Sequence, residues 1–335
     1  MAVSPAAFYL LLAAAAPQAT APGPAAVSPQ AAATPAPVQV KTCSLSDMID
    51  GLRQALRRGS PALRRYAREL LKESAVALDP DALRSAFARE TDPQLVEALG
   101  AALASRMART SNMELIKPQL DRATTDGDPA VRAAAVRSLR GIGAVEAMHA
   151  TRSPGYERLI LDAAPEVRKA VVDNLLEESA KVYFGHDRAV AEKAVQVAAA
   201  CPDPAQAARL LRDVSTESVG HGAVQELTHL LKTGSPEVRA AAALSLGGVP
   251  AAESAAARAD LLESYQKDSE AAVRRAVLEA LVHLGMSTAL PLLDSLRGID
   301  SAMTAELDLW RAALSSGLQE WSLLQREKQR LAASR

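Results

Sequence analysis

One stretch decides the fold: Asp128-Pro129-Ala130-Val131-Arg132-Ala133-Ala134-Ala135-Val136-Arg137-Ser138-Leu139-Arg140-Gly141-Ile142-Gly143. It has the features of a complete helix. The aspartate can cap the first turn through its carboxylate, and the proline after it suits the first helical position. Three apolar side chains lie four residues apart and share one helix face: Val131, Ala135 and Leu139. The two glycines at the end of the stretch indicate where the helix stops.

The same pattern recurs along the chain. The residue that opens each copy serves as a register mark, and the marks are Pro61, Pro93, Pro129, Pro165, Pro204, Pro236 and Ala271. The residue ten positions after the mark is aliphatic in every copy: Leu71, Leu103, Leu139, Leu175, Val214, Leu246 and Leu281. The residue two positions after the mark is aliphatic in all copies but one: Leu63, Leu95, Val131, Val167, Val238 and Val273, with Gln206 as the exception. This spacing predicts an internal repeat.

Each copy has room for a second helix, which we expect at residues 82–89, 114–122, 156–162, 189–200, 223–232, 255–266 and 288–296. A cap at Ser46 or Asp47 is expected to begin the first helix of the folded body. Neither helix of a pair buries its apolar stripe alone, but stacked pairs form a continuous core. Hydrophobic residues make up 49% of the chain, many of them alanine, and aromatic residues only 3%. Side chains this small suit closely packed helices and disfavour a β-sandwich. The sequence predicts an all-α fold, an α-α superhelix of about seven helical repeats.

The first 40 residues form a separate zone, because no Asp, Glu, Lys or Arg occurs before Lys41. Residues 6–16 form an apolar run that is too short to span a bilayer but suits the core of a secretory signal. We therefore expect a signal peptide at residues 1–16, a periplasmic or secreted protein, and no transmembrane segment in the mature chain. A cytoplasmic protein with an Ala-rich tail is the alternative. The prolines of residues 17–43 predict a disordered, extended linker.

Residues 300–335 are expected to close the solenoid, which fills residues 44–299. Asp300 or Ser301 suits the cap of a final helix or helix pair. The apolar residues of this segment are Leu307, Trp310, Leu314, Leu318, Trp321 and Leu324. The two tryptophans are eleven residues apart, so they are expected on one helix face. Because a solenoid needs a terminal element with a polar face, we interpret the segment as a C-terminal cap. A partner-binding amphipathic helix is the alternative.

The pattern Asp-Pro-x-Val-Arg-x-x-Ala-x-x-x-Leu-x-x-Ile-Gly of residues 128–143 resembles a HEAT repeat of the short bacterial type, also called a HEAT-like or PBS-lyase repeat. Residues 235–249 and 269–285 resemble it nearly as well, and residues 165–176 resemble it in part. The resemblance covers most of the chain, from residue 60 to residue 298. It implies an α-α solenoid that binds other macromolecules. Because the repeat carries no assembled catalytic group, the leading hypothesis is a non-enzymatic protein-interaction scaffold with a protein partner and no cofactor.

Enzymes that use the same repeat supply the alternatives. Deoxyhypusine hydroxylase carries His-Glu pairs that hold two irons. This chain has five histidines, and none of them is followed by Glu: His149, His186, His221, His229 and His283. Phycobilin lyases handle a tetrapyrrole, and a lyase-like or other prosthetic-group-handling enzyme is the second functional hypothesis. HEAT-like DNA glycosylases use a basic, aromatic cleft. Nucleic-acid binding is the third hypothesis, and the net charge of -1 disfavours it.

A column of arginines falls three residues after the register marks: Arg64, Arg132, Arg168, Arg239 and Arg274. Such a column could bind an acidic partner or a phosphate chain. Alternatively, each guanidinium pairs with a carboxylate or a helix-end carbonyl of the adjacent repeat. We favour the second interpretation, because the same helix starts offer local carboxylates: Asp128, Glu166, Glu237 and Glu270. These carboxylates then act as caps and ion-pair partners rather than as an acid–base pair.

No catalytic, cofactor-binding or metal site is predicted. His221 and His229 are eight residues apart, whereas a helical zinc pair is spaced by four. Cys43 and Cys201 could form one disulfide in an exported protein, although a buried, small Cys201 is the favoured interpretation. One aromatic–polar cluster lies between two predicted helices: Tyr183-Phe184-Gly185-His186-Asp187. It is either a binding hot spot or, as we favour, a plug between repeats.

Overall fold

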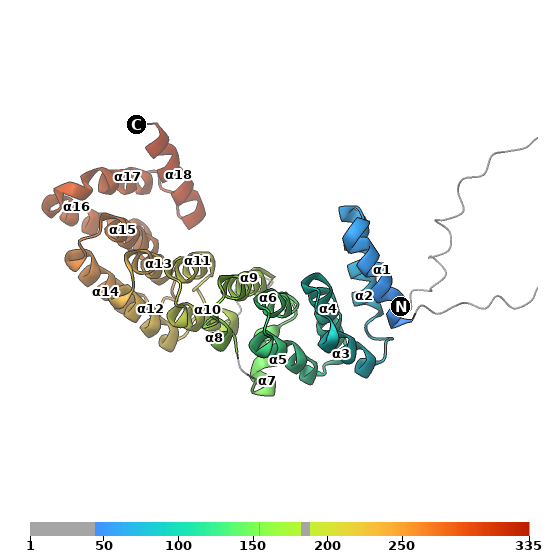
Figure 1. Ribbon diagram of the computed structural model, residues 1–335. Helices are drawn as coiled ribbons and strands as arrows, with labels where there is room; N and C mark the ends of the chain where they lie inside the picture. Colours follow the sequence, from blue (N-terminus) through green and yellow to red (C-terminus); the bar gives the residue numbers. More distant parts are fainter. Residues whose placement is uncertain (1–43, 154, 182–187, 335) are drawn as a thin grey trace, which may run out of the picture. The chain divides into compact units, whose positions relative to one another are not determined.

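The computed structural model describes residues 44–153, 155–181 and 188–334 (Figure 1). Within these ranges the secondary structure is helical and contains no strand, which confirms the predicted all-α class. The predicted signal peptide at residues 1–16 and linker at residues 17–43 lie outside the described residues. The α-helices are α1 (Leu45–Arg58), α2 (Pro61–Ser74), α3 (Pro80–Arg89), α4 (Pro93–Thr110), α5 (Lys117–Thr125), α6 (Pro129–Arg137), α7 (Ala144–Thr151), α8 (Tyr156–Leu159), α9 (Pro165–Lys181), α10 (Arg188–Ala200), α11 (Pro204–Asp213), α12 (His221–Thr233), α13 (Pro236–Gly247), α14 (Ser254–Lys267), α15 (Ala271–Gly285), α16 (Leu290–Ile299), α17 (Thr304–Leu314) and α18 (Trp321–Ala333). Short 3-10 helices are η2 (Met113–Ile116), η3 (Met286–Ala289) and η4 (Ser301–Met303).

The helices that begin at the register marks, which we call the marked helices, form one layer: α2, α4, α6, α9, α11, α13 and α15. Each marked helix packs against the next one along the chain (Figure 1). Each also packs against the helix that precedes it, as α12 does with α13 and α14 with α15. The intervening helices form a second layer, in which α12 contacts both α10 and α14. This two-layer arrangement is the predicted α-α solenoid.

Side chains cap the helix starts in the way that the sequence predicts. Ser60, Asp92 and Asp128 each accept a hydrogen bond from the first turn of their helix, and a proline occupies the first helical position after each. The first helix is an exception to the prediction, because Ser44 is its cap rather than Ser46 or Asp47. The Ser44 hydroxyl accepts from the Asp47 N–H, and the Asp47 carboxylate accepts from the Ser44 N–H, which forms a capping box.

The predicted apolar register defines the core, with one correction. All seven side chains ten positions after the marks are buried: Leu71, Leu103, Leu139, Leu175, Val214, Leu246 and Leu281. Two positions after the marks, the aliphatic side chains are also buried except in the first copy. There Leu63 is 49% exposed. The reason is that α2 is the first marked helix of the described chain, so no earlier marked helix covers its outer face.

The second helices differ from prediction where glycines interrupt the chain. Gly141 and Gly143 have φ values of 70° and 71°, a left-handed conformation that favours glycine. The chain turns there and forms the additional helix α7, which the sequence pattern does not predict. The helix expected at residues 156–162 is then reduced to the single turn α8. Elsewhere the expected second helices are present, two of them preceded by the 3-10 turns η2 and η3.

The C-terminal segment contains the predicted helix pair, but the cap and the tryptophans differ from expectation. The Asp300 carboxylate caps η4 rather than an α-helix. Trp310 lies on α17 and Trp321 begins α18, so they do not share the face of one helix. The turn between the helices contains Gly317, whose φ is 77°. The two indole rings face each other across the helix pair, with ring centroids 5.7 Å apart.

One described stretch, Ala271–Ile299, is long and apolar enough to cross a membrane by length and composition. In the structure it comprises α15, η3 and α16, and α15 packs against α13 and α14 within the stack. Val273, Leu278 and Leu293 are fully buried among these helices. Because these side chains are buried, the high hydropathy of the stretch is explained by its place in the core of the solenoid.

Candidate interaction surface

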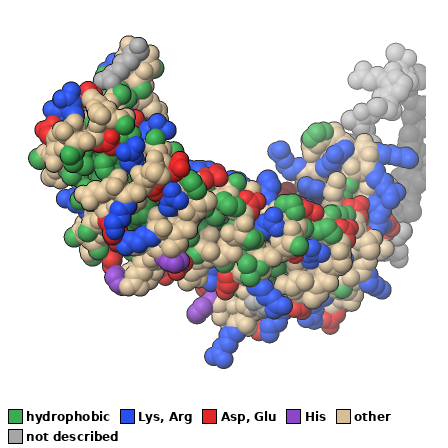
Figure 2. Space-filling view, turned by 60° about the vertical axis from the view of Figure 1, so that its left-hand side comes forward, with side chains coloured by type: hydrophobic (Ala, Val, Ile, Leu, Met, Phe, Trp, Pro, Cys, Tyr) green, Lys and Arg blue, Asp and Glu red, His purple; other side chains and the backbone are tan. Residues whose placement is uncertain are grey.

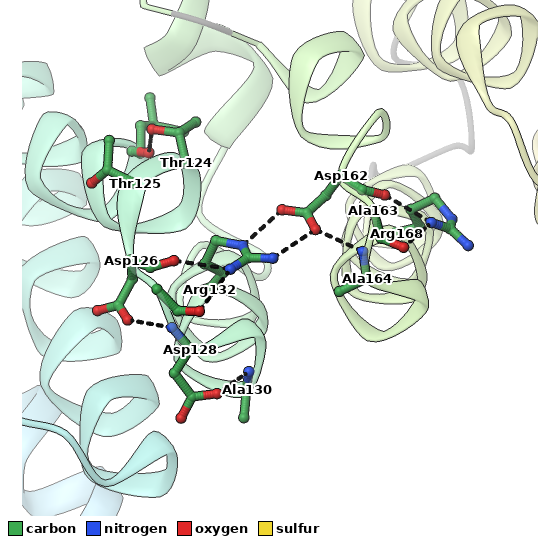
Figure 3. A network of polar contacts seen from close by, with 12 residues as sticks. Thr124, Thr125, Asp126, Asp128, Ala130, Arg132, Asp162, Ala163, Ala164 and Arg168 are labelled. Carbon is green, nitrogen blue, oxygen red and sulfur yellow. Dashed lines mark hydrogen bonds and ion pairs between the residues drawn. The ribbon is translucent and has the colours of Figure 1, made fainter.

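The arginines of the column make hydrogen bonds and ion pairs within the solenoid. Arg132 of α6 donates from Nε and Nη2 to the Asp162 carboxylate at 2.8 and 2.9 Å, and from Nη1 to the Asp126 carbonyl at 2.9 Å (Figure 3). Asp162 lies just before α9 and also accepts from the Ala164 N–H. The hydrogen bonds from Arg132 lower the pKa of Asp162 below its ordinary value. The pair therefore joins one repeat to the turn of the next.

The same pairing recurs near the C-terminal end. Arg239 donates to Asp268 from Nε at 2.7 Å and from Nη2 at 3.0 Å. Arg274 donates to Asp300 at 3.0 Å. The favoured interpretation of the column therefore holds, but the local carboxylates that the sequence suggested are not the partners. Asp162 and Asp268 both lie three residues before the next register mark, and this fixed offset is the signal that sequence reasoning missed.

Two members of the column lack a carboxylate contact in the described residues. Arg64 donates from Nε to the Gly59 carbonyl at 3.0 Å. Arg168 donates from Nη1 to the Asp162 and Ala163 carbonyls, and its buried Nε has no hydrogen-bond partner. Three residues before the next mark, where three other repeats have Asp126, Asp162 and Asp268, the chain has Cys201. The sequence therefore interrupts the Arg–Asp pairing at this step of the stack.

The other residues considered for catalysis or metal binding do not form a common site within the described residues. His221 Nδ1 lies 3.0 Å from Glu253, and His229 lies on the same helix without joining it. The described residues contain no group of three or more His, Cys, Asp or Glu side chains that could hold a metal. Cys201 is half-buried, and burial raises the pKa of its thiol. Cys43 and the aromatic cluster at residues 183–187 lie outside the described residues, so the disulfide and the plug remain predictions.

A solvent-open hollow of about 310 Å³ lies where four helices meet, and we call it the α11–α18 hollow. It is lined by Arg212 at the end of α11, Glu217 in the following loop, Ser245 of α13, Glu279 and His283 of α15, and Trp321 and Gln325 of α18. Two of the helices that line it, α13 and α15, pack closely against each other. A Cβ at Gly247 would come within 2.8 Å of the Ala280 Cα, so only glycine lets α13 and α15 approach this closely.

Helix α18 closes one side of this hollow. The Trp321 ring stacks on His283, with centroids 4.1 Å apart and planes 11° apart, and on Trp310 behind it. Gln325 donates to Glu279 at 2.9 Å. Burial of the imidazole lowers the pKa of His283, against the opposing effect of Glu217. His283 is therefore neutral at pH 7 and presents a flat, uncharged face to the indole.

Comparison with known protein families gives a match in this part of the chain. A family model described as HEAT repeats matches residues 185–281 and, in a second match, residues 224–304. Residues 185–304 of this chain contain HEAT repeats. The matched HEAT repeats span α10 to α16, and they supply every lining residue of the α11–α18 hollow except those of α18. The hollow is thus formed by the HEAT repeats on one side and by the terminal helix on the other.

Solved structures resemble this chain at low sequence identity. YibA of Escherichia coli is 15% identical, with 84% of this chain and 92% of that chain covered and a TM-score of 0.40. Kap121p is 14% identical, with 87% of this chain but only 33% of that chain covered and a TM-score of 0.49. Human deoxyhypusine hydroxylase in complex with glycerol is 18% identical, with coverages of 81% and 96% and a TM-score of 0.28. No curated protein matches.

Proposed function

We propose that this HEAT-repeat chain is a non-enzymatic protein-interaction scaffold and that a segment of its partner docks in the α11–α18 hollow. HEAT repeats generally mediate protein interactions, and the fold supports that general role. The observation that carries the proposal is the exposed rim of the hollow. Arg212 and Glu217 are exposed there beside the half-buried Trp321. Tryptophan and arginine are enriched among the residues that dominate binding at protein interfaces.

The size and chemistry of the hollow favour a short protein segment as its occupant. A volume of about 310 Å³ is at the small end of ligand pockets and accommodates one or two side chains. The rim offers one positive and one negative group, and the lining combines the polar side chains of Ser245, Glu279 and Gln325 with the rings of His283 and Trp321. An apolar or aromatic side chain with polar neighbours would complement both.

Site-specific photocrosslinking in native cells tests this proposal. A photoreactive amino acid at Arg212 is expected to give a discrete adduct of higher mass, and mass spectrometry would identify the partner. Ala256, exposed on α14 in the other layer, is the matched control position and should give no such adduct. An adduct from both positions, or from neither, would contradict docking in the hollow.

A charge-reversed variant gives a second test. Arg212→Glu places two carboxylates on the rim and is expected to weaken capture of the crosslinked partner at least tenfold, because like charges replace a complementary pair. Arg158→Glu, at an exposed position on α8, is the matched control. The lyase-like alternative predicts instead that the purified protein carries colour or metal. A colourless, metal-free preparation with an intact partner adduct would remove that alternative.

We further propose that the protein functions outside the cytoplasm, on the composition of residues 1–16. Fractionation of native cells with N-terminal sequencing of the mature chain tests this. A start between residues 14 and 40 in an extracytoplasmic fraction is expected. A cytoplasmic protein with an intact Met1 would contradict export and would favour a scaffold that acts inside the cell.

A further inference from the structure

The first helix pair carries a concentrated positive charge. Residues 53–72 contain seven basic residues and one acidic residue, whereas the whole chain has a net charge of -1. Five of the arginines gather where α1 ends and α2 begins: Arg57, Arg58, Arg64, Arg65 and Arg68. We call these five, with the exposed Leu63 and Tyr66 between them, the N-terminal basic surface. Figure 2 shows Lys and Arg side chains clustered at this end of the described chain.

Ion pairs within the fold leave this charge largely uncompensated. Asp50 and Glu90 pair with Arg53, and Glu69 pairs with Lys72, so these carboxylates are already engaged by the other two basic residues. Three exposed arginines of the surface have no carboxylate partner among the described residues: Arg57, Arg58 and Arg65. Arg64, also exposed, donates to the Gly59 carbonyl. Arg132 and Arg239, by contrast, are held by aspartates. The N-terminal arginines are thus available to an external anion.

Apolar side chains lie between these arginines. Leu63 is 49% exposed and Tyr66 is 52% exposed, one turn apart on α2. At the equivalent position of the next repeat, Leu95 is fully buried. Exposed aliphatic and aromatic side chains surrounded by arginines are the arrangement by which amphipathic helices bind the interface of an anionic bilayer.

We propose that the N-terminal basic surface binds the anionic face of a phospholipid bilayer. Lipid phosphates would pair with the arginines, and Leu63 and Tyr66 would enter the boundary between headgroups and acyl chains. The aliphatic Leu63 favours a bilayer over a nucleic acid, because a phosphate backbone offers no apolar layer to receive it. This binding is independent of the α11–α18 hollow, which is formed by other helices.

Sedimentation of the full chain with lipid vesicles tests the proposal. Binding is expected to vesicles of equal parts phosphatidylglycerol and phosphatidylcholine, to be much weaker with phosphatidylcholine alone, and to fall in high salt. The variant Arg57→Gln/Arg58→Gln/Arg65→Gln should bind the anionic vesicles about 100-fold more weakly, because each arginine contributes about fivefold. The control Arg158→Gln/Arg275→Gln/Arg326→Gln removes three exposed arginines elsewhere and should bind as the wild type does.

A second variant separates the apolar contribution from the charge. Leu63→Ser/Tyr66→Ser keeps every charge and should still weaken binding to anionic vesicles about tenfold. Thermal melting by circular dichroism checks that each variant folds. The apolar residues 6–16 would bind vesicles regardless of lipid charge, so equal binding to both vesicle types would overturn the proposal. So would equal binding by the triple variant and its control, or salt-sensitive binding to an oligonucleotide with none to vesicles.

Discussion

At the scale of single residues, the partner of a column arginine depends on the residue three positions before the next register mark. Where that residue is Asp162 or Asp268, the guanidinium makes two hydrogen bonds with one carboxylate. Where it is Cys201, Arg168 has only carbonyl partners and a buried Nε without one. The residue at this position therefore decides whether the column arginine has a carboxylate partner, while other pairs such as Arg209 with Asp173 join α9 and α11.

The Arg132–Asp162 pair makes stability dependent on pH. Because the pKa of Asp162 is lowered in the folded protein, its contribution is complete above the unfolded value near 4 and is lost as the pH falls through the folded value. Asp162→Asn should cost about 2 kcal/mol of unfolding free energy at pH 7, measured by urea denaturation. The difference from the wild type should vanish at acidic pH. Asp121→Asn, on the exposed face of α5, is the control, and an equal loss there would contradict the assignment.

The interrupted step offers the reverse experiment. Cys201→Asp restores the residue found at residues 126, 162 and 268, and it should give Arg168 a carboxylate partner. The gain is expected to be about 1 kcal/mol of unfolding free energy, measured by urea denaturation at pH 7. Cys201→Asn has nearly the same shape without the charge and should give no gain. If both variants lose stability equally, Arg168 does not pair in the way that Arg132 does.

At the scale of elements, α18 is held by a small number of specific contacts. Trp321 stacks between His283 and Trp310, and Lys328 lies 4.6 Å from the centre of the Trp310 ring and pairs with Glu306. Apart from Leu324, the described residues of α18 are at least partly exposed. The helix therefore docks on the solenoid through its first turns and one cation.

Removal of the Trp321 ring should release α18 without unfolding the HEAT repeats. Trp321→Ala is expected to cost about 2 kcal/mol locally, since aromatic stacking and buried area are both lost. Hydrogen exchange should then accelerate in α18, while α13 and α15 remain protected. Leu323→Ala, at an exposed position of the same helix, is the control. Unchanged exchange in the Trp321→Ala helix would show that the stack does not hold it.

The sequence pattern predicts the elements well because each helix carries its own local signals. Proline, a capping side chain and a four-residue apolar spacing all lie in or next to the helix that begins at Pro129. Most of these signals recur at the other marks, although the last copy has Ala271 in place of the proline and Glu270 without a side-chain cap. The α11–α18 hollow has no such local signal. It depends on the turn at Gly317, which returns α18 onto α15, and on contacts such as Gln325 with Glu279 that link distant parts of the chain. The helices can therefore be predicted from residue spacing in the sequence, whereas the α11–α18 hollow could be identified only from the structure.

At the scale of the described solenoid, each repeat contacts mainly its neighbours, so stability is approximately a sum of repeat and interface contributions. Such a protein need not unfold as one unit. Damage to one repeat is transmitted through its two interfaces and weakens with each further step along the stack. The solenoid should therefore respond to a core defect by local unfolding rather than by a single global transition.

Leu139→Glu tests this behaviour at the centre of the stack. Leu139 is fully buried, so the variant places an unpaired charge between repeats and should cost about 4 kcal/mol or more. Hydrogen exchange followed by mass spectrometry should show lost protection from α4 to α9 and retained protection in α13 and α15. Leu161→Glu is the same substitution at a side chain that is 60% exposed, and it should leave exchange unchanged. Uniform loss of protection from α2 to α17 would mean instead that the repeats fold as one cooperative unit, and the milder Leu139→Ala would then be expected to shift a single melting transition.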